Sequence, residues 1–549
     1  MDKIWLKNYQ KGVAKEVDPH VYASLNALLD ESLQKNGPRT AYISMGTHLS
    51  FHDLEQHSRH LATYLQSLNL AKGTRVAVML PNILQYPISI LAILRAGMIV
   101  VNTNPLYTAN ELEHQLQDAG AEVAIIYAQC IPTFLQALPQ LRKLKHMIVT
   151  KIGDLLPWSK RILFNMLSQL NHSKYAHILP QSIPFQQVLQ QGSQGQFQPV
   201  VCNHDDIAFL QYTGGTTGVT KGAILTHQNI IANILQTSAW IAPASLGQDD
   251  LIVTALPLYH IFSLTANCLL FMHMGICNLL IPDPRRTKSL LKQIHDNRPT
   301  ALTGVNTLFS SILNHPKFNP SDFTQLKITL SGGMALNQHV AEQWKEAIHR
   351  PIIEAYGLTE ASPAVCINPL DRPVQGSIGL PLPNTDISIR DAEGKECAIG
   401  ETGELCIHGP QIMRGYWENP QETALVFHKD GFLRTGDAAT VDKKGFIYLV
   451  DRIKDMIIVS GFNVYPHEVE DVIAQMDKVL EVGMIGVPSK SGNERIKACV
   501  VASDPSLTKE EIIAHCRLHL TAYKIPKIVE FYPELPKTNV GKILRRMLR

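Results

Sequence analysis

Residues 212–222 read Tyr212-Thr213-Gly214-Gly215-Thr216-Thr217-Gly218-Val219-Thr220-Lys221-Gly222. The apolar run 207–212 predicts a buried strand before this stretch, and 223–227 predicts a second short strand after it. Glycines in the loop between them let backbone N–H groups face an anion, and the threonine hydroxyls add hydrogen-bond donors. Lys221 contributes a positive charge. The stretch therefore predicts a phosphate-binding loop, and we expect the phosphates to be those of a nucleotide.

This loop differs from a Walker A motif, which needs Gly-Lys followed by Ser or Thr at the start of a helix. Here the order is Thr220-Lys221-Gly222, and the loop lies between two predicted strands. A flexible glycine hairpin is the alternative, and an isolated glycine-rich loop would favour it. The density of hydroxyl groups favours the phosphate loop, and motifs further along the chain support the same interpretation.

The size and composition of the chain limit the kinds of protein that it can be. Its 549 residues exceed one ordinary domain, and chains of this length form roughly two to four compact units. Apolar residues make up 45% and charged residues 18%, as in globular proteins, and a net charge of +2 gives no indication of nucleic-acid binding. The nine cysteines are scattered without a Cys-x-x-Cys pair, which argues for reduced thiols and against a disulfide framework or a zinc ribbon.

The hydrophobic patterns indicate an α/β protein. Strands and helices alternate through residues 75–127 and again through 228–380, which is typical of parallel sheets. The pattern is broken over 150–200, which includes a glutamine-rich, low-complexity run. Short strands and turns over 385–450 predict a β-rich unit, and a small α+β domain is expected from about 455 onwards.

Two stretches bear on membrane contact. Residues 264–281 carry no formal charge, but their polar side chains favour a buried helix ending at Met274-Gly275 and a buried strand at 276–281. The stretch Leu155–Phe164 is basic, aromatic and amphipathic, which suits an anionic membrane surface; an ordinary surface helix is the alternative. The N-terminus lacks the apolar core of a signal peptide. We expect a cytoplasmic protein, with peripheral contact at the inner face of the cell membrane left open.

Several polar residues follow predicted strands. His260 lies between a strand end and an apolar helix, where a lone histidine is usually a core residue. Gly332 and Gly333 follow the predicted strand 326–330, at the edge of a sheet where ligands bind, and they allow close approach of a flat ring. A simple turn is the alternative for this glycine pair.

The run 354–360, Glu-Ala-Tyr-Gly-Leu-Thr-Glu, carries three groups suited to a nucleotide. Taken alone, a strand-to-loop turn is the alternative for this run. Tyr356 offers a face to adenine, and Thr359 offers a hydroxyl to the α-phosphate. Glu360 offers a hard carboxylate oxygen to Mg²⁺, which is the usual partner of triphosphate oxygens. Further along, the Asp437 carboxylate is able to accept hydrogen bonds from both ribose hydroxyls.

Together these stretches resemble the adenylate-forming enzymes, which include acyl-CoA synthetases, firefly luciferases and peptide-synthetase adenylation domains. The motifs follow the family's order over nearly the whole chain. Other stretches resemble bacterial long-chain fatty acyl-CoA synthetases in particular. They are Gln85-Tyr86-Pro87, Pro105-Leu106-Tyr107-Thr108, Pro257–Phe262, Gly304–Phe309 and Val459–Pro466.

The resemblance implies a fold and a domain arrangement. A large N-terminal domain, residues 1–451, would consist of α/β sheets and carry a β-rich subdomain at about 385–450. Residues 452–454 would form a hinge, with Lys454 as the residue about which the last domain rotates. Residues 455–549 would form a small, mobile α+β C-terminal domain.

The resemblance also implies ATP-dependent activation of a fatty acid in two steps. The acid first forms acyl-AMP and pyrophosphate, and CoA then forms acyl-CoA and releases AMP. Thr213 and Glu360 would help to bind Mg²⁺, His260 would orient the carboxylate, and Lys542 would bridge the carboxylate and the α-phosphate. The nucleotide residues implied are Thr213, Gly214, Gly215, Thr216, Thr217, Gly218, Lys221, Gly332, Gly333, Glu354, Ala355, Tyr356, Thr359, Asp437 and Arg452.

An apolar tunnel for the acyl chain is implied as well. Leu264 occupies the position at which some family members carry an aromatic residue that gates the tunnel. We therefore do not expect the same gating mechanism to operate unchanged in this chain. The implied tunnel residues are Ile261, Phe262, Leu264, Val305, Leu308 and Phe309.

Three alternatives remain open at this point. The chain resembles ligases closely enough that it could load an acyl group onto a carrier protein instead of CoA, or activate an aromatic acid such as coumarate. A non-catalytic acyl-binding protein is the alternative outside enzymes. Either a monomer or a homodimer is compatible with the sequence.

Overall fold

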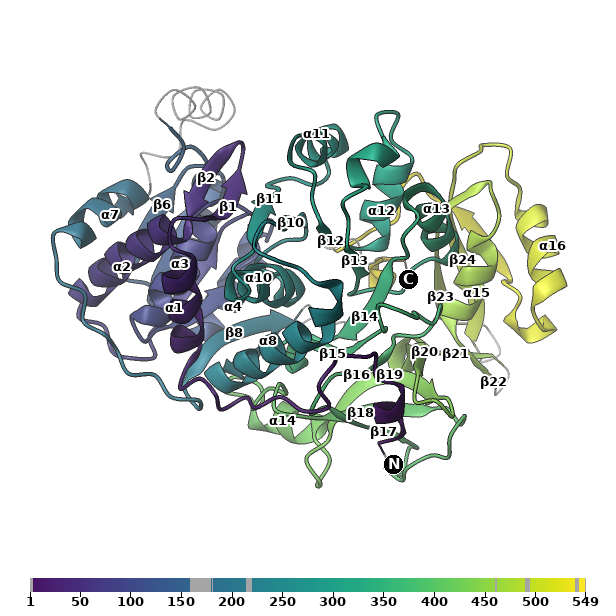
Figure 1. The fold of residues 1–549 in the computed structure, drawn as a ribbon. Helices are drawn as coiled ribbons and strands as arrows, with labels where there is room; N and C mark the ends of the chain where they lie inside the picture. The colour runs from purple at the N-terminus through teal and green to yellow at the C-terminus, as the bar shows by residue number, and fades with distance from the viewer. Residues whose placement is uncertain are drawn as a thin grey trace.

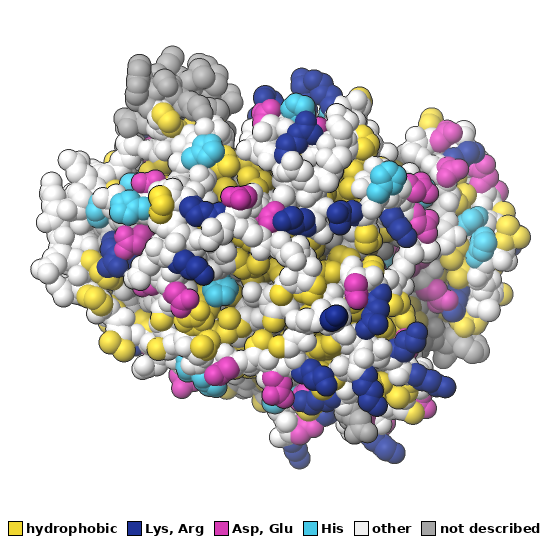
Figure 2. Space-filling view, viewed as in Figure 1, with side chains coloured by type: hydrophobic (Ala, Val, Ile, Leu, Met, Phe, Trp, Pro, Cys, Tyr) yellow, Lys and Arg dark blue, Asp and Glu magenta, His cyan; other side chains and the backbone are white. Residues whose placement is uncertain are grey.

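A computed structural model describes residues 3–157, 179, 181–213, 220–459, 462–488, 494–538 and 543–548. Within these ranges the strands form five sheets, of nine, seven, four, three and two strands. Figure 1 shows the two large sheets with their helices in the left and central parts of the molecule, and the last part of the chain, drawn in yellow, at the right. Figure 2 shows charged side chains of both signs on this face, with Lys and Arg side chains gathered at its lower right.

The seven-stranded sheet contains the strands on both sides of the glycine-rich loop. Its order is β7-β6-β5-β3-β4-β8-β9, and all neighbours are parallel except the antiparallel pair β8–β9. The parallel alternation expected from the sequence is confirmed here. The strands are β3 (Arg75–Met79), β4 (Ile99–Asn102), β5 (Val123–Tyr127), β6 (His146–Thr150), β7 (Ser182–Pro184), β8 (Ile207–Thr213) and β9 (Lys221–Thr226).

The nine-stranded sheet supplies the other side of the site. Its order is β16-β15-β14-β13-β12-β10-β11-β1-β2, with a parallel centre and antiparallel strands at both edges. The strands are β1 (Thr40–Ser44), β2 (Thr47–Ser50), β10 (Leu251–Thr254), β11 (Cys277–Leu280), β12 (Ala301–Gly304), β13 (Ile328–Ser331), β14 (Ile353–Gly357), β15 (Ala364–Ile367) and β16 (Leu380–Pro381).

Local capping sets several helix starts. Ser50 and Asp53 form a capping box at the start of α2, and Thr226 and Asn229 form another at the start of α8. The helices of this part are α1 (Leu25–Asn36), α2 (Phe51–Ser67), α3 (Gln85–Arg95), α4 (Ala109–Ala119), α5 (Ile131–Ala137), α7 (Phe185–Ser193), α8 (His227–Ile241), α9 (Ile261–Ser263), α10 (Leu270–His273), α11 (Thr287–Asn297), α12 (Asn306–Leu313) and α13 (Gln338–Ile348).

The remaining elements form smaller units. The β-rich unit expected at 385–450 is a four-stranded antiparallel sheet, against which the N-terminal segment lies through a hydrogen bond from Asn8 to Lys444 O at 2.7 Å (Figure 1). The elements are β17 (Asp386–Arg390), β18 (Gly403–His408), α14 (Pro420–Val426), β19 (Leu433–Val441), β20 (Ile447–Arg452), β21 (Ile457–Val459), β22 (Phe462–Val464), α15 (Pro466–Ala474), β23 (Val479–Pro488), β24 (Glu494–Ala502), α16 (Lys509–His519) and β25 (Ile528–Phe531).

The structure settles three sequence-based expectations. The uncharged stretch 264–281 is a buried π-helix, Leu264–Leu269, followed by α10 and β11, which confirms core packing. The pattern does not break fully over 150–200, because β7 and α7 rejoin the sheet and α7 buries Phe185 and Val188 among the glutamines. Strand β13 begins at Ile328 rather than 326. None of the helices within the described ranges is both long enough and apolar enough to cross a membrane.

Candidate active site

The loop that carries His260 follows β10 of the nine-stranded sheet and is fixed by side chains on or directly after strands of the seven-stranded sheet. The Asn82 side chain, which follows β3, forms hydrogen bonds of 2.8 to 3.0 Å to the main chain of residues 254–258. Gln211 on β8 donates to the Tyr259 carbonyl at 2.8 Å. Since each bond is buried or partly buried, the loop has little freedom to move. His260 is thereby held where the two sheets approach each other.

The glycine pair after β13 lies beside the same loop. His260 Nδ1 accepts the Phe262 N–H at 3.4 Å and begins α9. A Cβ atom on Gly332 would lie 3.3 Å from the Phe262 ring and 3.2 Å from the Ala355 carbonyl. Gly333 has a φ of +81°, which favours glycine over other residues. Gly332 therefore permits the close approach of β13, β14 and α9, whereas the approach of a flat ring that the sequence suggested stays a prediction.

Tyr356, Asp437 and Arg452 form a connected polar cluster. The Tyr356 hydroxyl donates to Asp437 Oδ2 at 2.6 Å, and Arg452 Nε lies 2.6 Å from Asp437 Oδ1. Burial and the neighbouring carboxylate raise the pKa of Tyr356 well above its usual value, so the phenol remains a donor. The structure brings together three residues that the resemblance implies for nucleotide binding.

A second cluster adjoins the glycine-rich loop. Thr213 and Lys221 face each other at the ends of β8 and β9, and Lys221 forms an ion pair with Glu422. The Lys221 ammonium also lies 5.4 Å from the centre of the Tyr416 ring. The Tyr416 hydroxyl donates to Glu360 Oε1 at 2.7 Å. Tyr416 therefore links the cation and the carboxylate that the sequence placed around the phosphates.

The rest of the 354–360 run flanks this cluster. Glu354 and Ala355 lie on β14, and Thr359 begins a 3-10 helix, Thr359–Ala361, that packs against β8 and β9. Burial raises the pKa of Glu354 to about 7, although the Gly376 N–H donates to its Oε1 at 3.3 Å. Glu354 is therefore a titratable group at the edge of the site.

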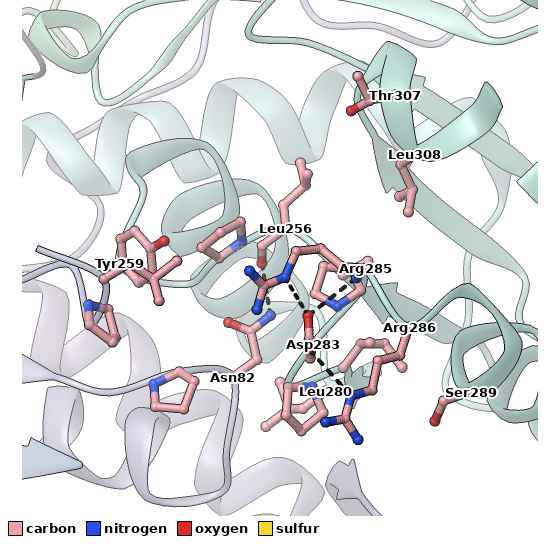
Figure 3. Close-up of a pocket in the computed structure, with 18 of the residues that line it drawn as sticks. Asn82, Leu256, Tyr259, Leu280, Asp283, Arg285, Arg286, Ser289, Thr307 and Leu308 are labelled. Atoms are coloured by element: carbon pink, nitrogen blue, oxygen red, sulfur yellow. Dashed lines mark hydrogen bonds and ion pairs between the residues drawn. The ribbon is translucent and has the colours of Figure 1, made fainter. Parts of the chain in front are cut away.

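A cavity of about 1440 Å³ lies beside the His260 loop, lined by residues of both large sheets and by Glu534–Thr538 near the C-terminus. Figure 3 shows Arg285 and Arg286 pointing toward Asp283, with Tyr259 on one side and Leu308 on the other. The wall therefore combines apolar surface with a charged rim. It has the mixed character of a channel for a molecule with an apolar part and a polar part.

The tunnel residues implied by the resemblance divide into three groups. Val305 and Leu308 line the cavity. Ile261, Leu264 and Phe309 are buried in hydrophobic cores and are not among the residues that line it. Phe262 is partly buried and contacts both cores, beside Gly332.

Lys454 lies in a 3-10 helix, Ile453–Asp455, directly after β20. Partial burial and the neighbouring Arg452 lower its pKa. Other candidates lie outside the described residues, so the structure does not place them. These are Gly214, Gly215, Thr216, Thr217, Gly218 and Lys542, together with most of the amphipathic stretch Leu155–Phe164.

Sequence reasoning missed four residues that shape the site. Tyr416 and Glu422 contact Glu360 and Lys221, whereas Asn82 and Gln211 hold the His260 loop. The aromatic pair Tyr416-Trp417 after Gly415 was a usable signal, because large aromatic residues directly after a glycine in a turn region suggest a close approach. The single polar residues Asn82 and Gln211, within apolar runs, offered no comparable pattern.

Comparison with known proteins defines the class in which this site belongs. Residues 29–417 match the AMP-binding enzyme family, and residues 468–542 match the AMP-binding enzyme C-terminal domain. The structure is similar to that of the anthranilate CoA ligase AuaEII in complex with anthranoyl-AMP, with a TM-score of 0.85 and 25% identity over 96% of this chain and 97% of that one. The chain therefore belongs to the AMP-binding, adenylate-forming enzyme family.

Within that family, the chain is similar to two bacterial proteins along its whole length. It is 50% identical to the long-chain-fatty-acid–CoA ligase of Yersinia pestis, over 100% of this chain and 98% of that protein. It is 48% identical to the long-chain-fatty-acid–CoA ligase of Escherichia coli O157:H7, over the same shares.

Proposed function

We propose that this protein is an ATP-dependent long-chain fatty acid–CoA ligase. It would convert a fatty acid and ATP to acyl-AMP and pyrophosphate, and then acyl-AMP and CoA to acyl-CoA and AMP. The observation that carries the proposal is the identity of 48 to 50% along the whole chain to enzymes of that name. The convergence of Tyr356, Asp437 and Arg452 at one place supports it independently.

The phosphate end of ATP would lie over the β8–β9 hairpin. We propose that Thr216, Thr217 and Lys221 hold the β and γ phosphates, and that Thr359 contacts the α-phosphate. Glu360 and Thr213 offer a carboxylate and a hydroxyl from neighbouring elements, which are hard oxygen ligands that fit Mg²⁺. The ion would neutralise phosphate charge, while the chain's own residues position the reacting groups.

The acid would meet the α-phosphorus beside His260. The fixed loop described above orients the imidazole toward the carboxylate, and Val305 and Leu308 contact the acyl chain in the adjoining cavity. No enzyme nucleophile is needed, because the carboxylate itself attacks phosphorus. Lys542 would stabilise the charge that develops between the carboxylate and the α-phosphate.

The second step requires a different arrangement of domains. We propose a large domain at residues 1–451, with a β-rich subdomain at about 385–450, a hinge at 452–454 and a small domain at 455–549. Turning about Lys454 would remove Lys542 from the site and admit CoA. The Lys542→Ala variant should slow adenylation far more than thioester formation from supplied acyl-adenylate, and equal losses would refute this role.

The decisive experiment measures AMP release by the purified protein with ATP, Mg²⁺ and CoA. Saturated fatty acids from short to long are compared with coumarate. AMP production that requires CoA and is greatest with long chains is the expected result. Pyrophosphate exchange without CoA-dependent turnover would indicate a carrier-protein acceptor, whereas the absence of adenylation with every acid would leave a non-catalytic acyl-binding protein.

We also propose that the enzyme works in the cytoplasm and contacts the inner face of the cell membrane. The proposal rests on the basic, amphipathic stretch Leu155–Phe164 and on the apolar nature of the substrate. Flotation with anionic vesicles tests it, with neutral vesicles as the control. Equal recovery with both kinds of vesicle would contradict an electrostatic contact.

A further inference from the structure

The strand before the proposed hinge and the first helix after it are joined by one carboxylate. Asp451 lies near the end of β20, three residues before Lys454, and its side chain is only 4% exposed. Its Oδ2 accepts the main-chain N–H of His467 at 2.8 Å. His467 is the second residue of α15, which lies on the other side of the hinge.

Helix α15 depends on this carboxylate because it lacks a cap of its own. Its N-cap residue, Tyr465, forms no side-chain hydrogen bond to the helix, and Pro466 occupies the first turn. The N–H groups of the first turn have no partners within a helix and carry partial positive charge. The Asp451 carboxylate therefore supplies, from the preceding domain, the acceptor that an N-cap side chain usually provides.

Arg545 completes the same cluster from the C-terminal end of the chain. Its guanidinium binds Glu470 of α15 with two hydrogen bonds, of 2.8 and 2.7 Å. It also lies 3.4 Å from Asp455 and 4.0 Å from Asp451. Residues on both sides of the hinge, and the C-terminal segment, thus share one ionic cluster.

The orientation that this cluster holds brings the C-terminal segment toward the His260 loop. Residues Pro536–Thr538 line the same cavity as Pro257 and Tyr259. In the proposed function this arrangement suits adenylation, because the C-terminal segment faces the place where the carboxylate would lie. A rotation about Lys454 would separate Asp451 from His467.

We propose that Asp451 is a positioning residue that caps α15 across the hinge and so favours the domain orientation for adenylation. The inference rests on the proposed two-step reaction and adds a residue that sets the balance between its steps. Asp451 does not contact substrate in this assignment; it acts through α15. Its removal should therefore affect the two half-reactions unequally.

The test compares Asp451→Ala with Asp442→Ala. Asp442 is a matched control, because its carboxylate also accepts main-chain N–H groups, at 2.8 and 2.9 Å, but only within the β19–β20 turn. Pyrophosphate exchange reports adenylation, and thioester formation from supplied acyl-adenylate reports the second step. Asp451→Ala should lower the rate of pyrophosphate exchange by roughly tenfold, because it removes one charge-assisted hydrogen bond. The rate of thioester formation should be unchanged or higher. The control should match the parent in both.

Asp451→Asn, which keeps an acceptor oxygen without the charge, should fall between the parent and Asp451→Ala. Equal losses in both half-reactions, or no loss in either, would overturn the proposal. If the parent itself adenylates no fatty acid, the proposed function fails, and the capping role is then judged by a separate measurement.

That measurement is the distance between spin labels on the two domains. Val21 and Leu518 are 62% and 80% exposed and are replaced by cysteine in a background in which Cys277 and Cys397, the native cysteines that are not buried, are serine. The parent should give one dominant distance, and Asp451→Ala should add a second population. An unchanged distribution in the folded variant would contradict the proposal whether or not activity is detected.

Discussion

The Tyr356 hydroxyl donates a hydrogen bond to Asp437 Oδ2 at 2.6 Å, although the two residues are separated by 81 positions in the chain. Arg452 holds the other oxygen of the same carboxylate at 2.6 Å. The carboxylate assigned to the ribose is therefore oriented before any nucleotide binds. Such preorganisation reduces the cost of fixing side chains on binding.

The Asp437→Ala variant should raise the KM for ATP by about ten- to a hundredfold, because it removes charge-assisted hydrogen bonds worth ~1.5–3 kcal/mol and leaves Arg452 without its partner. Tyr356→Phe keeps the aromatic face and loses one hydrogen bond, so its KM should rise by less than about threefold. Steady-state kinetics with ATP varied measure both. Equal effects of the two variants would contradict the separate roles of ring and carboxylate.

The Lys221–Glu422 ion pair predicts competition between Glu422 and the phosphates of ATP. Glu422→Gln should free Lys221 and lower the KM for ATP by about 1.4- to fivefold, which corresponds to the ~0.2–1 kcal/mol of a partly exposed pair. Lys221→Gln should raise the KM at least about tenfold, because it removes a charge-assisted contact to phosphate. Glu122→Gln, which breaks a pair with Lys145 just before strands β5 and β6, is the control and should leave the KM unchanged. A raised KM in Glu422→Gln would refute the competition.

The cavity predicts a change in chain-length preference. Val305→Trp or Leu308→Trp should fill part of the cavity and shift the preferred acid toward shorter chains, with each excluded methylene worth ~0.8 kcal/mol. Phe309→Leu, at a fully buried site outside the cavity, should lower stability without changing the preference. Rates with acids of increasing length measure the shift. An unchanged preference in both tryptophan variants would place the acyl chain elsewhere.

The raised pKa of Glu354 predicts a pH-dependent stability. A carboxyl group whose pKa is about 7 when folded and near 4.3 when unfolded favours folding while it is protonated. That contribution is complete below about pH 4.3 and is lost as the pH rises through about 7, at ~1.4 kcal/mol per pKa unit. Glu354→Gln should therefore gain in melting temperature relative to the parent between pH 5 and pH 8. A constant difference across this range would contradict the assignment.

Local structure was largely predictable from the sequence. The strand expected at 207–212 before the glycine-rich loop is β8 (Ile207–Thr213), and the buried strand expected at 276–281 is β11 (Cys277–Leu280). Hydrophobic periodicity and helix capping depend on residues only a few positions apart, so the local sequence is enough to recognise them. The low-complexity stretch 181–198 was less readable, because its glutamines obscure the apolar positions that α7 buries.

The chemistry of the site was also present in the sequence, since the motif residues specify which groups are available to a nucleotide. Only the tertiary structure decided which groups meet. The Tyr416 hydroxyl donates to Glu360, and Glu422 pairs with Lys221, 201 positions away, while Asp451 accepts the main-chain N–H of His467 at the start of α15. These contacts depend on the path of the whole chain and on how the sheets pack, and no local pattern encodes that path. The sequence by itself determined the helices and strands and the reactive side chains. Packing between distant segments decided which side chains meet, how deeply each is buried and therefore how its pKa is shifted.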